Sequence, residues 1–138
     1  MSELKQGKVM QEEIAKKIKE LGELELDVLR IIEVYGGVLW KSEVQPSLKK
    51  FYDELGKDTP IESKDLKVAL MNLEKSKLIS IEQRTRGSLD SVGTYKDGYI
   101  CLSNPEPTKL ALLPDRTLMK YKVAVGRELG RRPDEFRS

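Results

Sequence analysis

The segment of residues 59–102 constrains the fold of this chain more than any other. Its first part, residues 61–76, predicts an amphipathic helix because four apolar residues recur at helical spacing: Leu66, Ala69, Leu70 and Leu73. Residues 79–86 follow, in which apolar residues alternate with polar ones, a pattern typical of a half-buried strand. A Gly/Ser-rich segment and a second β-like run, residues 99–102, follow. The pattern therefore predicts a helix that leads directly into a hairpin.

The turn chemistry of this segment leaves two points open. Thr59 and Ser63 compete as the N-cap of the helix, because both residue types cap helices well. The pair Asp97-Gly98 is a turn signal within the second half of the hairpin, so the return strand begins either at Tyr95 or at Tyr99.

Two further helices are predicted ahead of this segment. The first has a wide apolar face, and Gly36-Gly37 predicts its end. A short apolar run, residues 38–40, predicts a brief strand. Ser42 followed by Gln45 has the spacing of a capping box and predicts the start of the second helix. The apolar residues of these helices are Leu24, Val28, Ile31, Ile32 and Tyr35 in the first, and Val44, Leu48, Phe51 and Leu55 in the second.

Helices with narrow apolar stripes are expected at both ends of the chain. Asp115 is the expected cap of the last one and Gly130 its expected end. A narrow stripe buries little surface by itself, so the two helices either form a two-fold dimer interface or pack on their own domain. The candidate interface residues are Met10, Ile14, Ile18, Leu21, Leu118, Tyr121, Val125 and Leu129.

Composition excludes several kinds of chemistry. The chain has 138 residues, a formal net charge of +2 and no histidine, so neither a Ser-His-Asp arrangement nor a histidine metal ligand is possible. Its single cysteine, Cys101, rules out an intrachain disulfide. The chain contains neither of the glycine-rich phosphate-binding motifs, Gly-x-x-x-x-Gly-Lys-Ser/Thr and Gly-x-Gly-x-x-Gly. We therefore expect a protein that is not an enzyme and that uses no cofactor or metal.

The sequence also predicts where in the cell the protein is located. No apolar run approaches the roughly 20 residues of a membrane span, and the N-terminus lacks the apolar core of a signal peptide. We expect a cytoplasmic protein with no membrane partner. Lysine and glutamate are abundant and asparagine is scarce, a composition that leans towards thermophilic organisms.

The order helix, short strand, helix, helix, hairpin over residues 24–102 resembles the winged helix-turn-helix family. The end of the third helix, Leu-Met-Asn-Leu-Glu-Lys-Ser-Lys-Leu-Ile at residues 70–79, is similar to the family's Leu-x-x-Leu-x-Lys-Ser-x-Leu-Ile ending. The chain as a whole is similar to small archaeal members of this family, including crenarchaeal DNA-binding proteins that dimerise through extra helices. The resemblance implies a mainly α fold with a small β-hairpin (α+β). Its winged-helix domain would span residues 23–104, flanked by an N-terminal helical arm, 1–22, and a C-terminal helix with a basic tail, 105–138.

The resemblance also implies a function. In this family the third helix usually enters the major groove and the wing contacts the backbone or the minor groove. For this chain the resemblance implies a homodimeric protein that binds double-stranded DNA, either a transcription regulator or a nucleoid-associated chromatin-type protein. The candidate DNA-contacting residues, chosen by helical spacing and charge, are Lys64, Lys67, Met71, Asn72 and Lys75 on the helix, Arg84, Arg86 and Lys96 on the wing, and Arg131 and Arg132 in the tail.

In two respects the third helix of this chain differs from a strongly basic helix that reads DNA bases. The third helix has no arginine, the usual reader of guanine, and it carries Glu62, Asp65 and Glu74 among its lysines. The positive charge is concentrated instead in residues 109–138, which hold eight basic residues against four acidic ones. With Val68 and Met71 expected on the helix surface, the alternative is a protein–protein interaction module, an accessory subunit of a nucleic-acid-processing complex in transcription or replication.

Overall fold

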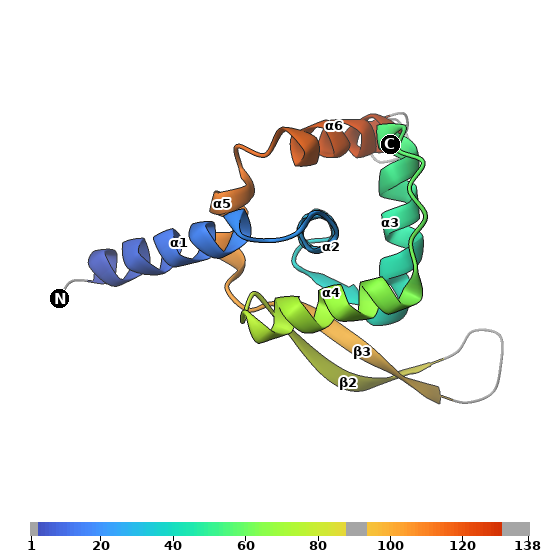
Figure 1. Ribbon diagram of the computed structural model, residues 1–138, viewed down its shortest axis with the longest axis horizontal. Helices are drawn as coiled ribbons and strands as arrows, with labels where there is room; N and C mark the ends of the chain where they lie inside the picture. Colours follow the sequence, from blue (N-terminus) through green and yellow to red (C-terminus); the bar gives the residue numbers. More distant parts are fainter. Residues whose placement is uncertain (1–2, 88–93, 131–138) are drawn as a thin grey trace, which may run out of the picture.

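The structure, a computed structural model, describes residues 3–87 and 94–130, and side chains within 9–87 and 94–125 (Figure 1). These ranges form an α+β fold of six helices and one three-stranded antiparallel sheet. The helices are α1 (Glu3–Lys19), α2 (Glu23–Val34), α3 (Lys41–Leu55), α4 (Ser63–Lys75), α5 (Pro105–Leu112) and α6 (Arg116–Gly130). The strands are β1 (Val38–Trp40), β2 (Ile79–Gly87) and β3 (Thr94–Leu102).

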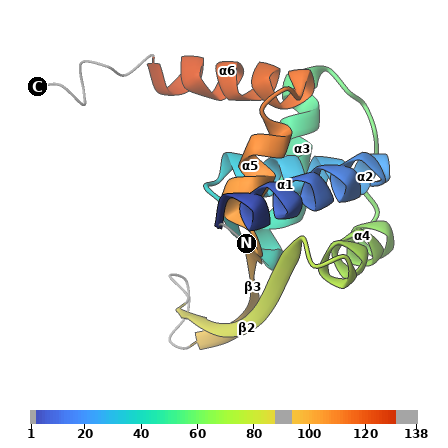
Figure 2. The same ribbon diagram turned by 90° about the vertical axis from the view of Figure 1, so that its left-hand side faces the viewer.

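The sheet has the order β1-β3-β2, so the hairpin strand β3 lies in the middle. Trp40 pairs with Tyr99, and Ile81 pairs with Ile100. At the base of the hairpin one face is apolar and packs against the helices, since Ile79 and Ile100 are almost fully buried. The distal part of the hairpin extends away from the helices (Figures 1 and 2).

Helix α2 lies in the middle of the other helices (Figure 1). Three residues of the expected apolar face, Val28, Ile31 and Ile32, are buried as the sequence predicted. Tyr35, expected on the same face, is 43% exposed, and Leu29, which was not expected there, is fully buried. Gly36 and Gly37 both have positive φ angles, and the Gly37 N–H donates to the Ile32 carbonyl at 2.9 Å. The predicted glycine stop is confirmed, because this left-handed geometry is one that glycine adopts without a steric cost.

The predicted capping box at the start of α3 is wrong. The helix begins at Lys41, so Ser42 lies inside its first turn. The cap comes instead from Asp97 on β3, whose Oδ1 accepts the Ser42 N–H at 3.3 Å while its Oδ2 accepts the Ser42 hydroxyl at 2.5 Å. The neighbouring Gly98 permits this approach, since a Cβ there would lie 3.2 Å from the Lys41 Cβ. The Asp97-Gly98 pair is therefore part of a strand and not a turn.

Two other boundaries also differ from expectation. Helix α4 begins at Ser63 with Glu62 in the capping position, so neither Thr59 nor Ser63 is the N-cap. The return strand begins at Thr94, before either of the two tyrosines considered for it.

The terminal helices pack on their own domain, so an interface built on their stripes is not supported. Helix α1 lies against α5, a short helix that the sequence did not predict, and Gln11 Nε2 donates to the Pro107 carbonyl at 3.1 Å. Helix α6 lies on α3. Four of the proposed interface residues are buried within the chain: Ile14, Ile18, Leu118 and Tyr121. Met10 is exposed, Leu21 and Val125 are half-buried, and the Leu129 side chain lies outside those described.

The predicted cap of α6 is confirmed, since Asp115 Oδ1 accepts the Leu118 N–H at 2.8 Å. Among the described helices, none combines the length and hydropathy that crossing a bilayer requires.

Candidate nucleic-acid interface

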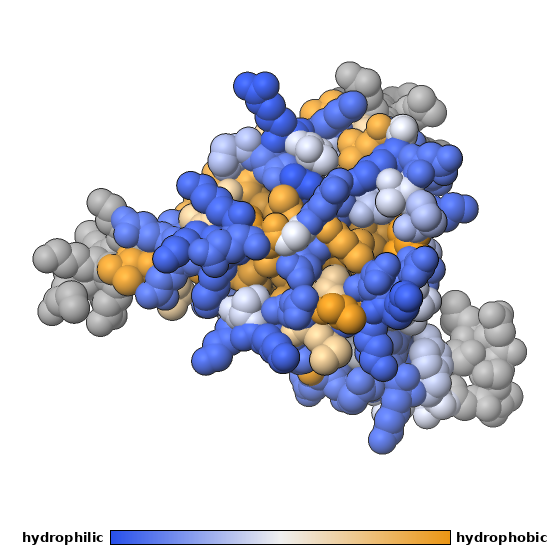
Figure 3. Space-filling model, in the orientation of Figure 1, coloured by the Kyte–Doolittle hydropathy of each residue, from blue (hydrophilic) through white to orange (hydrophobic). Residues whose placement is uncertain are grey.

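The outer face of α4 carries both exposed lysines and exposed apolar side chains. Leu66, Ala69, Leu70 and Leu73 point into the core. Directly opposite, at i, i+4, i+7 and i+11, lie the four residues that we term the α4 stripe: Lys64, Val68, Met71 and Lys75. Val68 is 54% exposed and Met71 is 49% exposed. Figure 3 shows a small apolar area among hydrophilic side chains in the region of α4.

The lysines around this stripe are available to an external anion. The side chain of Lys64 is 81% exposed and pairs only loosely with Glu62, at 3.8 Å. Within the described ranges Lys67 and Lys75 form no ion pair, and both are exposed. Asp65 and Glu74 lie at the two sides of the face rather than on the stripe, as their positions in the helical repeat require.

The side-chain amide of Asn72, a candidate for reading adenine, is already hydrogen-bonded within the chain. Its Nδ2 donates to Glu25 Oε2 on α2 at 2.8 Å. Glu25 also accepts the N–H of Gly22 through Oε1 at 3.1 Å, which completes the cap of α2. The amide of Asn72 thus links α4 to the start of α2.

The hairpin arginines are held by contacts within the chain. Arg84 stacks over the Tyr99 ring at 4.1 Å and pairs with Glu82 at 3.1 Å. The Tyr99 ring in turn meets Trp40 edge to face at 5.0 Å. Lys96, opposite Thr85 in the hairpin register, has no ion-pair partner among the described residues and is exposed.

Arg86 is the more strongly held of the two arginines. It donates to Asp97 Oδ2 at 3.0 Å and to Glu43 Oε1 at 3.2 Å, and it lies over the Trp40 ring at 4.4 Å. The hydrogen bond to Asp97 raises the pKa of Arg86, and the charged contact with Glu43 adds to this. Arg86 therefore fixes the hairpin to the first turn of α3, and these contacts leave little of its charge for a phosphate.

The carboxylate of Asp97 predicts a pH dependence of stability. Burial raises the pKa of Asp97, but hydrogen bonds from Ser42, Arg86 and the Gly98 N–H outweigh it and hold the pKa below its ordinary value. A carboxyl with a lowered folded-state pKa stabilises the fold above the unfolded-state pKa of about 4. That contribution is lost as the pH falls through the lower folded-state value.

We accordingly expect Asp97→Ala to destabilise the protein by a constant amount near neutral pH, and by progressively less below about pH 4. Urea unfolding of wild type and variant from pH 7 downwards measures the difference. A gap between the two proteins that stays constant through the acid range would contradict this role of the carboxylate.

A second charged cluster is buried between α2, α3 and α6. Asp27 accepts hydrogen bonds from the Tyr52 hydroxyl and from Arg30, both at 2.7 Å. Arg30 also donates two bonds to Asp115, at 2.9 and 3.1 Å. Burial lowers the pKa of Arg30, but its bonds to Asp115 and Asp27 outweigh burial and leave the pKa raised. These groups are paired with one another, so we assign them to the fold.

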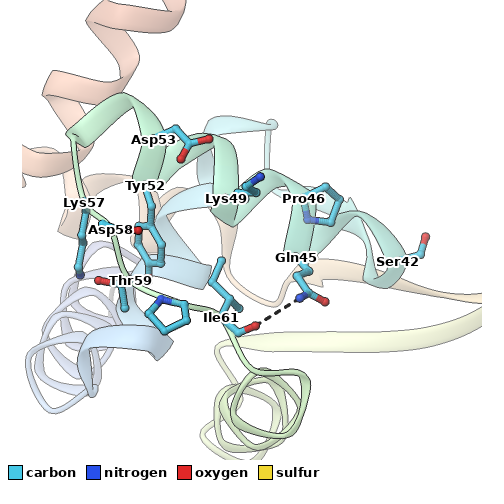
Figure 4. A pocket seen from close by; sticks show the side chains of 11 residues that line it. Ser42, Gln45, Pro46, Lys49, Tyr52, Asp53, Lys57, Asp58, Thr59 and Ile61 are labelled. Carbon is cyan, nitrogen blue, oxygen red and sulfur yellow. Dashed lines mark hydrogen bonds between the residues drawn. The ribbon is translucent and has the colours of Figure 1, made fainter.

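A groove of about 770 Å³ lies between α3 and the segment that leads to α4 (Figure 4). The side chains of Tyr52 and Ile61 form part of its apolar wall, and Lys49 and Asp53 stand at its edge. Gln45 Nε2 donates to the Ile61 carbonyl at 3.3 Å across it. The groove carries both signs of charge, so it does not by itself select an anionic ligand.

The residues predicted to contact DNA do not all lie on one surface. Helix α6, which begins the basic C-terminal segment, lies at the opposite end of the molecule from α4 and the hairpin in both views (Figures 1 and 2). Arg131 and Arg132 lie outside the described residues. The structure therefore brings Lys64, Lys67, Met71 and Lys75 together on α4, whereas Lys96 is on the separate hairpin.

Comparison of the chain with protein-family models and with curated proteins gives no match. One pairing at this site was not predicted from the sequence: the Ser42 hydroxyl on α3 donates to Asp97 on β3, whereas the Asp97-Gly98 pair predicted a turn.

Proposed function

We propose that residues 23–104 form a winged helix that binds double-stranded DNA, as a transcription regulator or chromatin-type protein. The observation that carries this proposal is the outer face of α4, where Lys64, Lys67 and Lys75 are exposed on a helix at the edge of the molecule. The element order α2-β1-α3-α4-β2-β3 and the sheet order β1-β3-β2 support it, because they are compatible with a winged helix in which α4 would be the second helix of the helix-turn-helix and the β2–β3 hairpin the wing.

In this arrangement α4 enters the major groove, which is wide enough for a helix. Its lysines bind backbone phosphates and set the position of the helix, since such contacts supply affinity rather than sequence preference. The hairpin lies at the same end of the molecule as α4 and contributes Lys96 (Figures 1 and 2). Arg84 and Arg86 act on DNA indirectly, because their contacts with Tyr99 and Asp97 fix the shape of the wing.

Charge reversal on α4 tests the proposal. We expect Lys67→Glu/Lys75→Glu to weaken binding to a short duplex by at least about tenfold at low salt, because two attractions to phosphate become repulsions. Fluorescence anisotropy with a labelled duplex measures the affinity, and circular dichroism checks that both proteins are folded.

The matched control is Arg116→Glu/Lys120→Glu on α6. It changes the net charge by the same amount on exposed residues at the far end of the molecule. We expect this control to bind within about twofold of wild type. Equal losses in the two variants would mean that only net charge matters, and a wild type that binds no duplex would defeat the proposal.

A second candidate function is a protein-interaction module. The exposed Val68 and Met71 favour it, because apolar residues on a helix face also suit a protein groove. Glu62, Asp65 and Glu74 also favour it, since they lower the positive potential of α4. This alternative predicts that the charge-reversed α4 variant and wild type behave alike towards duplex DNA.

A further inference from the structure

The α4 stripe has an unusual layout for a helix that contacts DNA. Val68 and Met71 occupy its centre and Lys64 and Lys75 its two ends. The ends are about 16 Å apart along the helix axis, at about 1.5 Å per residue. The major groove admits a helix. With the centre of the stripe facing the bases, the long lysine side chains at its two ends can extend to phosphates at the groove rims. The charge of the lysines complements the phosphates, which makes DNA a better occupant than an apolar protein groove.

The side chains that normally read base edges by hydrogen bonding are missing from the centre of this stripe. Arginine and lysine read guanine, asparagine and glutamine read adenine, and acids read cytosine. Helix α4 has no arginine or glutamine, and Asn72 is bound to Glu25 at 2.8 Å. Asp65 and Glu74 lie at the sides of the face. The groups left at its centre, Val68 and Met71, offer only apolar contact.

The major groove offers one apolar group that such side chains can read, the C5 methyl of thymine. We propose that Val68 and Met71 make the protein a reader of pyrimidine C5 methyl groups, so that it prefers A·T-rich duplexes through the major groove. This inference rests on the proposed function and specifies its ligand. Burying the methyl groups against these side chains removes apolar surface from water, while the lysines contribute affinity that is the same for every sequence.

Exchanging bases that differ only by this methyl group tests the inference. We compare an alternating A·T duplex with its A·U counterpart, in which uracil lacks the methyl but keeps the same hydrogen-bonding edges. We expect the uracil duplex to bind about fourfold more weakly for each methyl group contacted, the ratio that corresponds to about 0.8 kcal/mol. In the reverse direction, replacing cytosine by 5-methylcytosine in a G·C duplex should strengthen binding.

Val68→Ala/Met71→Ala isolates the side chains responsible. Alanine preserves helix propensity at these exposed positions, so the variant is expected to fold. We expect it to bind the thymine and uracil duplexes equally. The matched control is Leu110→Ala/Leu113→Ala, two residues 51% and 50% exposed near α5, which should keep the discrimination of wild type.

Each other outcome overturns the inference. If wild type binds thymine and uracil duplexes equally, the stripe does not read methyl groups, although DNA binding itself stands. If the Val68→Ala/Met71→Ala variant keeps the wild-type ratio, the discrimination comes from DNA shape. If no duplex binds wild type at low salt, the proposed function fails together with the inference, and a protein partner becomes the better account of the apolar residues.

Discussion

Phe51→Ala is expected to lower the free energy of unfolding by about 3–5 kcal/mol, the range for deleting a buried phenylalanine ring. Phe51 on α3 is fully buried. Its ring meets that of Tyr121 on α6 edge to face at 4.7 Å and lies 5.8 Å from that of Tyr52. The substitution therefore removes both buried apolar surface and the aromatic contact that joins α6 to the domain.

Urea unfolding followed by circular dichroism measures this effect as a lower midpoint with an unchanged slope. Leu113→Ala is the control, because this side chain is 50% exposed and its loss should change stability by less than about 0.5 kcal/mol. A Phe51→Ala protein as stable as the control would mean that α6 does not pack on α3 in the way described.

Asp27→Ala is expected to cost a similar amount, about 3–5 kcal/mol, because it breaks a buried ion pair from one side. Asp27 is 2% exposed. Its removal leaves the Tyr52 hydroxyl without its acceptor and takes one of the two carboxylates from Arg30. Arg30 also holds Asp115 at the start of α6, so the loss should extend to that helix.

Two comparisons separate burial from charge in this cluster. Lys57 pairs with both Asp27, at 3.8 Å, and Glu23. Glu23→Ala removes the second of these carboxylates, whose side chain is 76% exposed, so we expect a change below about 1 kcal/mol. Tyr52→Phe removes one hydrogen bond and leaves Asp27 paired with Arg30, so a loss of about 1 kcal/mol is expected. If Asp27→Ala costs no more than Glu23→Ala, the buried cluster does not stabilise the fold.

Some features that depend on neighbouring residues in the sequence were predictable, although neither local candidate for the N-cap of α4 was correct. The end of α2 at Gly36-Gly37 and the cap of α6 at Asp115 are local signals, and both are confirmed. The hydrophobic periodicity of α2, α3 and α4 likewise identified most of the buried apolar residues of these three helices, although not Leu29 and Tyr52, because burial of one helix face requires that spacing.

Features that depend on distant residues were not predictable. The cap of α3 is supplied by Asp97, 55 positions away in the chain, so the local Ser42 pattern pointed to the wrong partner. The same is true of Arg86, whose partners Trp40 and Asp97 come from two other strands. A single sequence shows that an arginine is present, but only the packed structure shows whether its charge is already used.

The candidate site was predictable in part for the same reason. The lysines of α4 follow from helical spacing and a known buried face, and the structure places them on one exposed surface. The helix periodicity also placed Val68 and Met71 opposite the core. By contrast, the contact of Asn72 with Glu25 joins two helices and has no sequence signature.

The salt dependence of duplex binding tests the central claim most directly. The titration of wild type and Lys67→Glu/Lys75→Glu is repeated from about 50 mM to about 200 mM salt. If α4 contacts phosphates, the logarithm of the binding constant falls by about 0.9 per contact for each unit of log salt. The variant should then show a slope shallower by about 2, whereas Arg116→Glu/Lys120→Glu should keep that of wild type. Identical slopes in all three proteins, or no binding by wild type at the lowest salt, would contradict the account.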